Sequence, residues 1–279
     1  MIKIVTDSTA YLPDEFIREH DIQVVPLCVH FGEEEFKECV NLTNEEFYAR
    51  LKKAPELPTT SQPSAGEFYE VYKELDDAGH EILTLTISSK LSGTWNSAMA
   101  AKEMLPEAKI SIVDSQSTSL GLQLMVDAAV QAVNEGATRA EAVERIEIIR
   151  DKVQVLFVVD TLEYLAKGGR IGNGKAFMGT MLRIKPILAL QDGAIEPLEQ
   201  VRSKRKALAR MEDLIVEHAG SNGAQAKVTI AHALAPHEAE AAKDDLCARL
   251  GCPQPVVTDI GPVIGTHTGP GVVGVAIYV

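Results

Sequence analysis

Short β-rich runs alternate with helical patterns along the first half of the chain, and this alternation constrains the fold more than any other feature. The apolar runs are IKIV (2–5), IQVVPLCV (22–29), ILTLTI (82–87) and ISIVD (110–114). Helical patterns lie near 13–20, 44–53, 65–78, 94–105 and 120–135. Strands separated by helices are typical of a largely parallel sheet covered on both faces. We therefore predict an α/β fold with such a sheet in its N-terminal part.

Three helix starts are marked by a hydroxyl residue followed three positions later by glutamate. In such a capping box, side chain and backbone satisfy each other's free groups at the first turn. The pairs are Thr43 with Glu46, Ser64 with Glu67 and Thr138 with Glu141.

The second half of the chain has a different pattern. It holds the Gly-rich run KGGRIGNGK (167–175), a hairpin signal around Asp192 and Gly193, a basic helix near 204–218 and a terminal strand at 271–279. These features predict a mixed α/β unit. A chain of 279 residues usually forms more than one compact unit. We expect an N-terminal domain at 1–152 and a C-terminal domain at 153–279.

Composition and charge exclude several classes of protein. No run approaches the roughly 20 apolar residues of a membrane span, and the first residues do not resemble a signal peptide, so we expect a cytoplasmic protein without stable membrane insertion. The four cysteines lack CxxC spacing, so neither a disulfide framework nor a zinc site is expected. We also expect no cofactor and no other metal. The net charge of −13 disfavours nucleic-acid binding. The segment 167–210 nevertheless contains ten Lys or Arg against three acids.

Two hydroxyl-rich segments are candidates for binding an anion. SSKLSGTWNSA follows the run at 82–87 and leads into a helix, so Ser92 and Gly93 lie where free N–H groups and the helix dipole favour negative charge. TTSQPS (59–64) offers hydroxyls in a loop flanked by prolines. Alternatively, Ser92 is an ordinary helix cap and TTSQPS is a polar linker.

The loop GTHTGPG (265–271) places His267 between two threonines and close to several glycines. Its ring could donate to a carboxylate from one nitrogen, or the residue could be a buried structural histidine. The strand ends TDST and VDSQSTS offer Asp7, Ser8, Asp114 and Ser115 either as turn formers or as support for the hydroxyl groups.

A hydrolase is one interpretation of these residues, with Ser92 and His267 as nucleophile and base beside an aspartate. However, the sequence lacks the GxSxG nucleophile elbow, and a serine that caps a helix is poorly placed for attack. Neutral hydroxyls and a histidine fit a carrier better, because they can hold a carboxylate by hydrogen bonds. The serine-dependent lipid or ester hydrolase remains the alternative.

Six motifs in fixed order resemble those of the bacterial DegV family, whose members bind fatty acids and act as partners of fatty acid kinase. They are TDST, TTSQPS, SSKLSGTWNSA, KGGRIG, VRSKRKA and HTGPG, and they span essentially the whole chain. The resemblance implies a two-domain α/β fold with the acyl chain buried between the domains. It also implies that the protein is a carrier rather than an enzyme. The ligand would be palmitate, stearate or oleate, presented to a separate kinase for phosphorylation.

The resemblance also implies roles for individual residues. Thr60, Ser92 and His267 match positions near the fatty-acid carboxylate, with the Gly93 backbone assisting. Thr59, Thr60 and Ser61 are consecutive hydroxyls, so Ser61 is a further candidate. Arg170 and Arg202 match basic positions linked to the kinase and to the acyl phosphate.

The apolar stretch at 176–190 is a candidate lining of the acyl tunnel, because methionine adapts to flexible chains. Ordinary core packing is the alternative. The candidate lining residues are Phe177, Met178, Met181 and Leu182.

Overall fold

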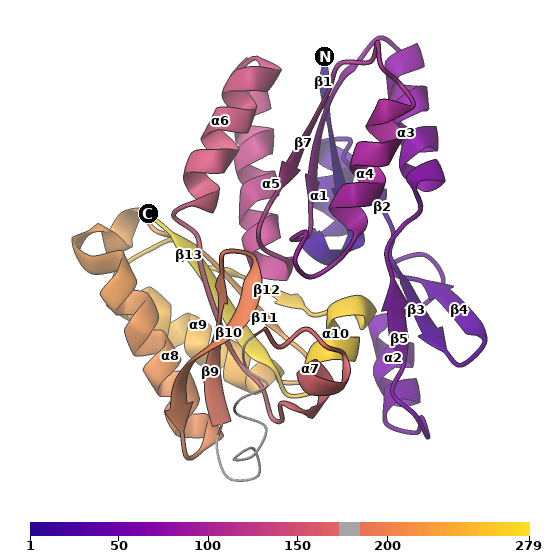
Figure 1. Ribbon diagram of the computed structural model, residues 1–279. Helices are drawn as coiled ribbons and strands as arrows, with labels where there is room; N and C mark the ends of the chain where they lie inside the picture. Colours follow the sequence, from indigo (N-terminus) through magenta and orange to yellow (C-terminus); the bar gives the residue numbers. More distant parts are fainter. Residues whose placement is uncertain (173–184) are drawn as a thin grey trace.

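The computed structural model describes residues 1–172 and 185–279 (Figure 1). A four-stranded parallel sheet in the order β2-β1-β6-β7 forms the N-terminal part. Its strands are β1 Ile2–Asp7, β2 Gln23–Val25, β6 Glu81–Thr86 and β7 Ile110–Asp114. All but the first residue of β6 are buried, as expected for a strand covered on both faces. The predicted parallel sheet is confirmed.

Helices cover both faces of this sheet. One face packs against α1 Asp14–Glu19, α5 Ser119–Asn134 and α6 Arg139–Arg150, with the short helix η1 Ser8–Ala10 at the end of β1. The other face packs against α3 Ala65–Asp77 and α4 Thr94–Glu103. The predicted capping boxes are present at the starts of α2 Asn44–Leu51, α3 and α6, with both reciprocal hydrogen bonds in each.

The run IQVVPLCV does not form one strand. Its first part is β2, whereas β3 Cys28–Phe31 belongs to a small antiparallel sheet with β4 Glu34–Lys37 and β5 Thr59–Ser61. Pro26 separates the two strands, because proline has no N–H to donate to a sheet. The Leu27 N–H that follows donates to Ser8 Oγ at 3.1 Å instead of to a strand. The predicted loop at 59–64 was also wrong in part, since Thr59–Ser61 pair with β3.

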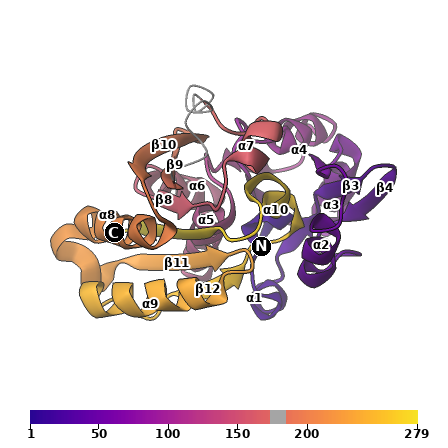
Figure 2. The ribbon, with the colours of Figure 1, turned by 90° about the horizontal axis from the view of Figure 1, so that it is seen from below.

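A six-stranded mixed sheet in the order β10-β9-β8-β13-β11-β12 forms the C-terminal part. One face packs against α8 Lys204–Ala219 and α9 Pro236–Leu250, and Figure 2 shows both helices along the same side. The short helix η3 Gly220–Gln225 follows α8. The predicted hairpin is confirmed as β9 and β10. The strands are β8 Gln154–Val158, β9 Lys185–Gln191, β10 Ala194–Val201, β11 Lys227–His232, β12 Val256–Asp259 and β13 Val273–Tyr278.

The two large sheets share helix α5. Its residues pack against β1 and β6 of the first sheet and against β11 and β13 of the second. Two short helices, α7 Glu163–Lys167 and α10 Pro262–Thr268, lie near the small sheet, and α10 contacts α2, β3 and β5 (Figures 1 and 2). The division into 1–152 and 153–279 falls between α6 and β8 and stays a prediction, since α5 and α2 both pack across it. Within the described ranges, no helix combines the length and hydropathy needed to cross a membrane.

Candidate functional site

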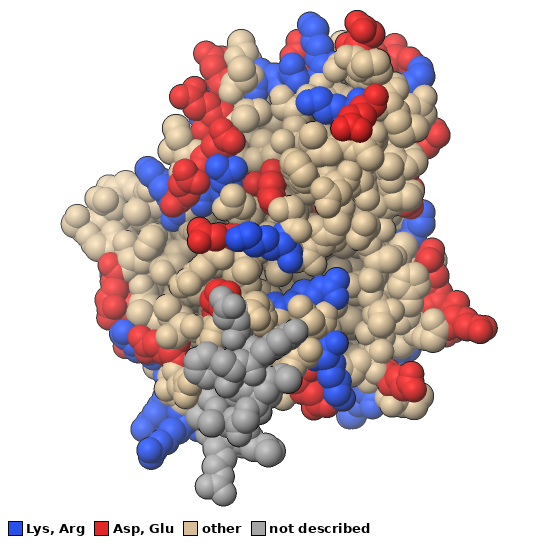
Figure 3. All heavy atoms as spheres, viewed as in Figure 1, with Lys and Arg blue, Asp and Glu red and all other residues tan. Residues whose placement is uncertain are grey.

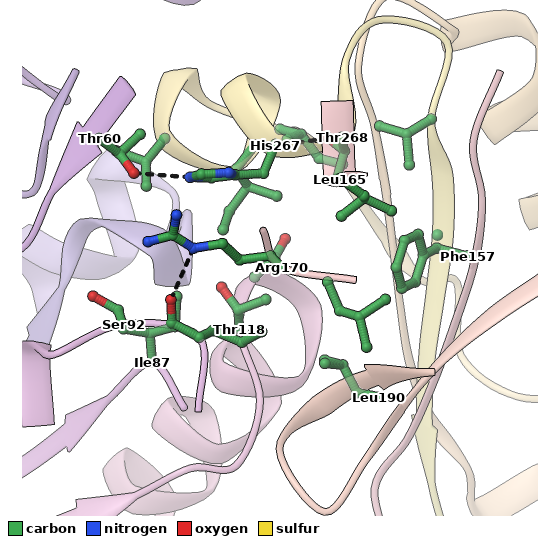
Figure 4. Close-up of a pocket in the computed structure, with 18 of the residues that line it drawn as sticks. Thr60, Ile87, Ser92, Thr118, Phe157, Leu165, Arg170, Leu190, His267 and Thr268 are labelled. Atoms are coloured by element: carbon green, nitrogen blue, oxygen red, sulfur yellow. Dashed lines mark hydrogen bonds between the residues drawn. The ribbon is translucent and has the colours of Figure 1, made fainter. Parts of the chain in front are cut away.

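A pocket lies between the two halves of the chain, where α10, β5, the start of α4 and the second sheet meet. Much of its wall is apolar and includes Ile87, Leu120, Phe157, Leu165, Leu190 and Ile195. Polar side chains gather at one end (Figure 4). We call this group the polar end: Thr60, Ser61, Ser92, Arg170 and His267.

Thr60 and His267 are hydrogen-bonded to each other. Thr60 Oγ1 lies 2.8 Å from His267 Nε2, and this bond joins β5 to α10 across the pocket. His267 was predicted in a loop, but it lies in the last turn of α10. Gly265 allows this helix to pack closely on α2, since a methyl group there would lie 2.7 Å from Tyr48 Oη. This close packing of α10 on α2 requires glycine at position 265, whereas in the sequence the same glycine indicated a loop.

His267 is buried and is held in its uncharged form. Burial, aided by the nearby positive charge of Arg170, lowers its pKa to about 4. Its second ring nitrogen, Nδ1, has no hydrogen-bond partner within the described residues and faces Gly168. A methyl group at Gly168 would collide with Nδ1, so glycine is required for α7 to approach the imidazole. A neutral imidazole can hydrogen-bond a carboxylate without first taking up a proton.

Ser92 lies just before α4, as predicted, and its Oγ lies 2.9 Å from Thr94 Oγ1. The neighbouring Gly93 is the N-cap residue of α4 and makes no side-chain capping hydrogen bond. Gly93 does not line the described pocket. The Gln62 side chain packs so closely on it that a methyl group would collide with the Gln62 amide. Ser61 does line the pocket and also lies 2.8 Å from His30 Nε2.

Arg170 lies inside the pocket wall rather than only at a rim. Its guanidinium donates to Gly168 O at 2.7 Å in its own segment and to Leu91 O at 3.3 Å beside Ser92, and the side chain lies between His267 and Ser92 (Figure 4). Both acceptors are neutral carbonyl groups, so these bonds do not cancel its charge. The polar end therefore contains a positive charge close to three hydroxyl groups and a histidine.

Two buried acids, Asp7 at the end of β1 and Glu38 directly after β4, support both sides of the polar end. Asp7 accepts a hydrogen bond from Ile87 N at 2.6 Å, which holds the segment leading to Ser92. Glu38 is fully buried and accepts from Val263 N at 2.8 Å, at the start of the helix that carries His267. Ser8 Oγ donates to Glu38 Oε2 at 2.5 Å. Asp7 and Ser8 thus act as support, and Asp7 also caps η1 by accepting from Thr9 N at 3.0 Å, so both of its expected roles are present.

Asp114 and Ser115 act as turn formers, and Asp114 also supports the segment that carries Ser92 by accepting from Ser89 N at 3.2 Å. Asp114 Oδ1 accepts from Gln116 N at 2.9 Å, and Ser115 Oγ accepts from Ser117 N at 3.0 Å. Two residues shortly after them, Thr118 and Ser119, line the pocket and were not among the predicted site residues. Only their position at the start of a helix, a few residues after the end of β7, could have indicated them.

The comparisons with known proteins agree with this architecture. A family model described as "Uncharacterised protein, DegV family" matches residues 1–279. The chain belongs to the DegV family. It is 36% identical over 275 residues to Protein DegV of Bacillus subtilis, covering 98% of both chains. A DegV domain-containing protein of Halalkalibacterium halodurans is 39% identical over 279 residues, covering 100% of this chain and 98% of the other.

Solved DegV structures have the same fold. A DegV family protein of Thermus thermophilus, described as binding fatty acid, matches with a TM-score of 0.93 at 33% identity, covering 99% of each chain. DegV of Bacillus subtilis, described as a fatty acid binding protein, matches with a TM-score of 0.90 at 35% identity, covering 99% of this chain and 98% of that one. A stearic acid-binding protein of Eubacterium ventriosum has a TM-score of 0.93 at 28% identity, with 100% and 98% covered. The predicted α/β DegV fold is confirmed.

Two further predictions concern residues away from the polar end. Arg202 lies exposed between β10 and α8 and does not line the described pocket. The candidate tunnel residues Phe177, Met178, Met181 and Leu182 lie outside the described residues. Leu190, at the end of the same apolar stretch, lines the pocket.

The geometry of this DegV protein does not favour the hydrolase alternative. Within the described residues, His267 is hydrogen-bonded to Thr60 and not to Ser92. A catalytic triad needs a base that contacts the nucleophile and a carboxylate that orients the base. In the described part of the chain, neither contact is present, because Ser92 pairs with Thr94 and no carboxylate binds His267 Nδ1.

Proposed function

We propose that this chain binds a long-chain fatty acid by its carboxylate and presents it to a fatty acid kinase, which converts it to an acyl phosphate. The observation that carries this proposal is a pocket with one polar end and an otherwise largely apolar wall. Fatty acids share this division into a charged head and an apolar chain. The fatty acid binding described for the Thermus thermophilus and Bacillus subtilis relatives supports the same ligand class.

The polar end suits a carboxylate in its number of donors and in its charge. An ionised carboxylate accepts up to about four hydrogen bonds and donates none. Thr60 and Ser92 would donate hydrogen bonds, His267 would orient the Thr60 hydroxyl group by accepting or donating at Nε2, and Arg170 would supply the opposite charge. Ser61 is a further donor on the same strand as Thr60. The head group would therefore enter a site whose groups are already in place.

The apolar wall would supply most of the binding free energy. Burying about 14 methylene groups at roughly 0.8 kcal/mol each gives on the order of 11 kcal/mol before the costs of ordering the ligand. The hydrogen bonds of the polar end then need only orient the ligand. Such a division explains why the site needs few polar residues to hold palmitate, stearate or oleate.

The basic segment at 167–210 supports a role for a partner. Lys204 pairs with Asp160 and Glu238, and Arg210 pairs with Glu199 and Glu217. By contrast, Arg202, Arg205 and Lys206 are exposed and have no ion-pair partner within the part of the chain that the structure describes. Figure 3 shows Lys and Arg side chains across the junction of the two halves. The cations at the start of α8 that are unpaired within the described residues would attract an acidic partner and help to offset the charge of an acyl phosphate.

Ligands of equal chain length but different head group test the carboxylate proposal. Calorimetric titration of ligand-free protein should give tight binding of palmitate, at least tenfold weaker binding of hexadecanol and no binding of hexadecyltrimethylammonium. The alcohol lacks the charge that Arg170 would bind, and the cation would be repelled by it. Equal affinity for palmitate and hexadecanol would show that the carboxylate is not recognised.

An ester-turnover assay separates the carrier from the hydrolase. The carrier should show no turnover that depends on Ser92, so wild type and Ser92→Ala should give the same background rate. Turnover that disappears in Ser92→Ala would contradict the proposed function.

A further inference from the structure

The start of α5 places two buried hydroxyl groups in the wall of the pocket. Thr118 and Ser119 are each 8% exposed, and both line the pocket. Within the described residues, neither Thr118 Oγ1 nor Ser119 Oγ has a hydrogen-bond partner. Buried hydroxyl groups are almost always paired, because leaving one unpaired is costly. A saturated acyl chain passing these atoms would leave them unpaired.

The two hydroxyl groups lie close to the polar end. Ser88 N donates to Ser117 O at 2.7 Å, which ties the start of α5 to the segment that carries Ser92. Ser92 N in turn donates to Ser88 O at 3.0 Å. In Figure 4, Thr118 lies between Ser92 on one side and Leu190 on the other. The hydroxyl pair therefore lies where the polar end gives way to the apolar wall. A fatty acid whose carboxylate is bound at the polar end would pass the pair with its first carbons.

The position on the helix favours an oxygen atom as partner. α5 is a 16-residue helix whose capping residue, Thr118, makes no side-chain capping bond. The first N–H groups of a helix and the positive end of its dipole attract electron-rich atoms. A hydroxyl group can also donate to a carbonyl oxygen or exchange hydrogen bonds with another hydroxyl group.

We propose that Thr118 and Ser119 form a second polar subsite, which binds an oxygen carried on the β-carbon of the fatty acid, as in a β-hydroxy acid. This inference rests on the proposed function, because it takes the carboxylate to be bound at the polar end. The subsite would bind oxygen substituents close to the carboxylate and leave the rest of the chain to the apolar wall. It would give a specificity that chain length alone does not provide.

Competition between palmitate and β-hydroxypalmitate tests the subsite. Each enantiomer of β-hydroxypalmitate is titrated against bound palmitate in wild type, Thr118→Val, Ser119→Ala and Thr118→Ser. One enantiomer should bind wild type about tenfold more tightly than palmitate, the effect of one or two added hydrogen bonds. In Thr118→Val, the ratio of β-hydroxypalmitate affinity to palmitate affinity should be close to one. Thr118→Ser keeps the hydroxyl group and should keep the wild-type ratio.

Thr86→Val is the matched control. Thr86 is also fully buried with no partner for its hydroxyl group in the described residues, but it does not line the pocket. In Thr86→Val, the ratio of the two affinities should equal that of wild type. Tighter binding of palmitate by wild type would overturn the inference while leaving the proposed function intact, and so would equal weakening of both acids in Thr118→Val. Failure of wild type to bind either acid would instead overturn the proposed function.

Discussion

Thr60 Oγ1 and His267 Nε2 lie 2.8 Å apart although 207 positions separate the two residues in the chain. One residue belongs to an edge strand of the small sheet and the other to the last turn of α10. The bond joins two elements that lie on opposite sides of the polar end. Changes that break this bond, or that shift either element, should therefore affect ligand binding more than fold stability.

Thr60→Val removes this bond while keeping the shape of the side chain. We expect palmitate affinity to fall roughly two- to tenfold, the range for loss of one hydrogen bond. Thr59→Val is the matched control, because Thr59 lies on the same strand but is exposed and does not line the pocket. Fluorescent fatty-acid displacement would measure both. If Thr59→Val lowered palmitate affinity more than Thr60→Val, the ligand-binding hydroxyl group would be that of Thr59 and not that of Thr60.

Gly168→Ala should disturb His267 from its other side. The added methyl group would collide with His267 Nδ1, so the imidazole must shift and its hydrogen bond to Thr60 must be distorted. We expect at least a tenfold loss of palmitate affinity with a smaller change in melting temperature. Gly66→Ala provides the control, since its methyl group would meet only Ser64 Oγ, at 3.7 Å. Unchanged binding in Gly168→Ala would mean that the position of the imidazole does not matter.

Glu38→Gln should change how stability depends on pH. Burial raises the pKa of Glu38 to about 7 from an ordinary 4.5, so the folded state holds its proton more tightly than the unfolded state. The stabilisation from this group is complete below about pH 4.5 and is lost as the pH rises to about 7. Glutamine stays neutral throughout, so the variant should lose less stability between pH 5 and pH 8.

Urea denaturation at the two pH values measures this difference. We expect the free energy of unfolding to fall between pH 5 and pH 8 by about 2–3 kcal/mol more in wild type than in Glu38→Gln, since one pKa unit corresponds to about 1.4 kcal/mol. Asp7, whose pKa is raised to about 6 by burial, titrates in both proteins, so the comparison reports the change at position 38 together with its coupling to the Asp7 charge. Equal pH dependence in both proteins would show that Glu38 does not titrate in this range.

Arg202 and Arg170 should separate kinase interaction from lipid binding. Arg202→Glu should lower the rate of acyl phosphate formation by the kinase at least tenfold and leave palmitate binding unchanged, because Arg202 is exposed and outside the pocket. Arg170→Gln should weaken both, since its guanidinium lies in the pocket wall. Arg18→Glu, at an exposed position on α1, controls for the change in net charge. Loss of lipid binding in Arg202→Glu would contradict this division.

Local signals in the sequence predicted the elements that depend on local interactions. The capping boxes of α2, α3 and α6 form as expected, because their hydrogen bonds join residues three positions apart. The parallel sheet followed from the alternation of strands and helices. The split at Pro26 was missed, because an apolar run does not show which sheet each of its parts joins.

The site was harder to predict, because its geometry depends on contacts between distant segments. The glycines around His267 suggested a loop, but Gly265 is needed where α10 packs on Tyr48 and Phe47, a contact that no local pattern reveals. Thr118 and Ser119 resemble ordinary turn residues until the tertiary structure buries them in the pocket wall. Arg170 was predicted to face a partner, and only the fold shows that it also lines the pocket.

Native mass spectrometry of the protein purified from cells without detergent tests the central claim most directly. The account predicts a mass above that of the bare chain by the mass of one long-chain fatty acid, lost on delipidation and restored by palmitate. The variant Thr60→Val should retain less of this ligand than Thr59→Val. A chain that carries no such mass under gentle ionisation, and that does not take up palmitate, would contradict the account.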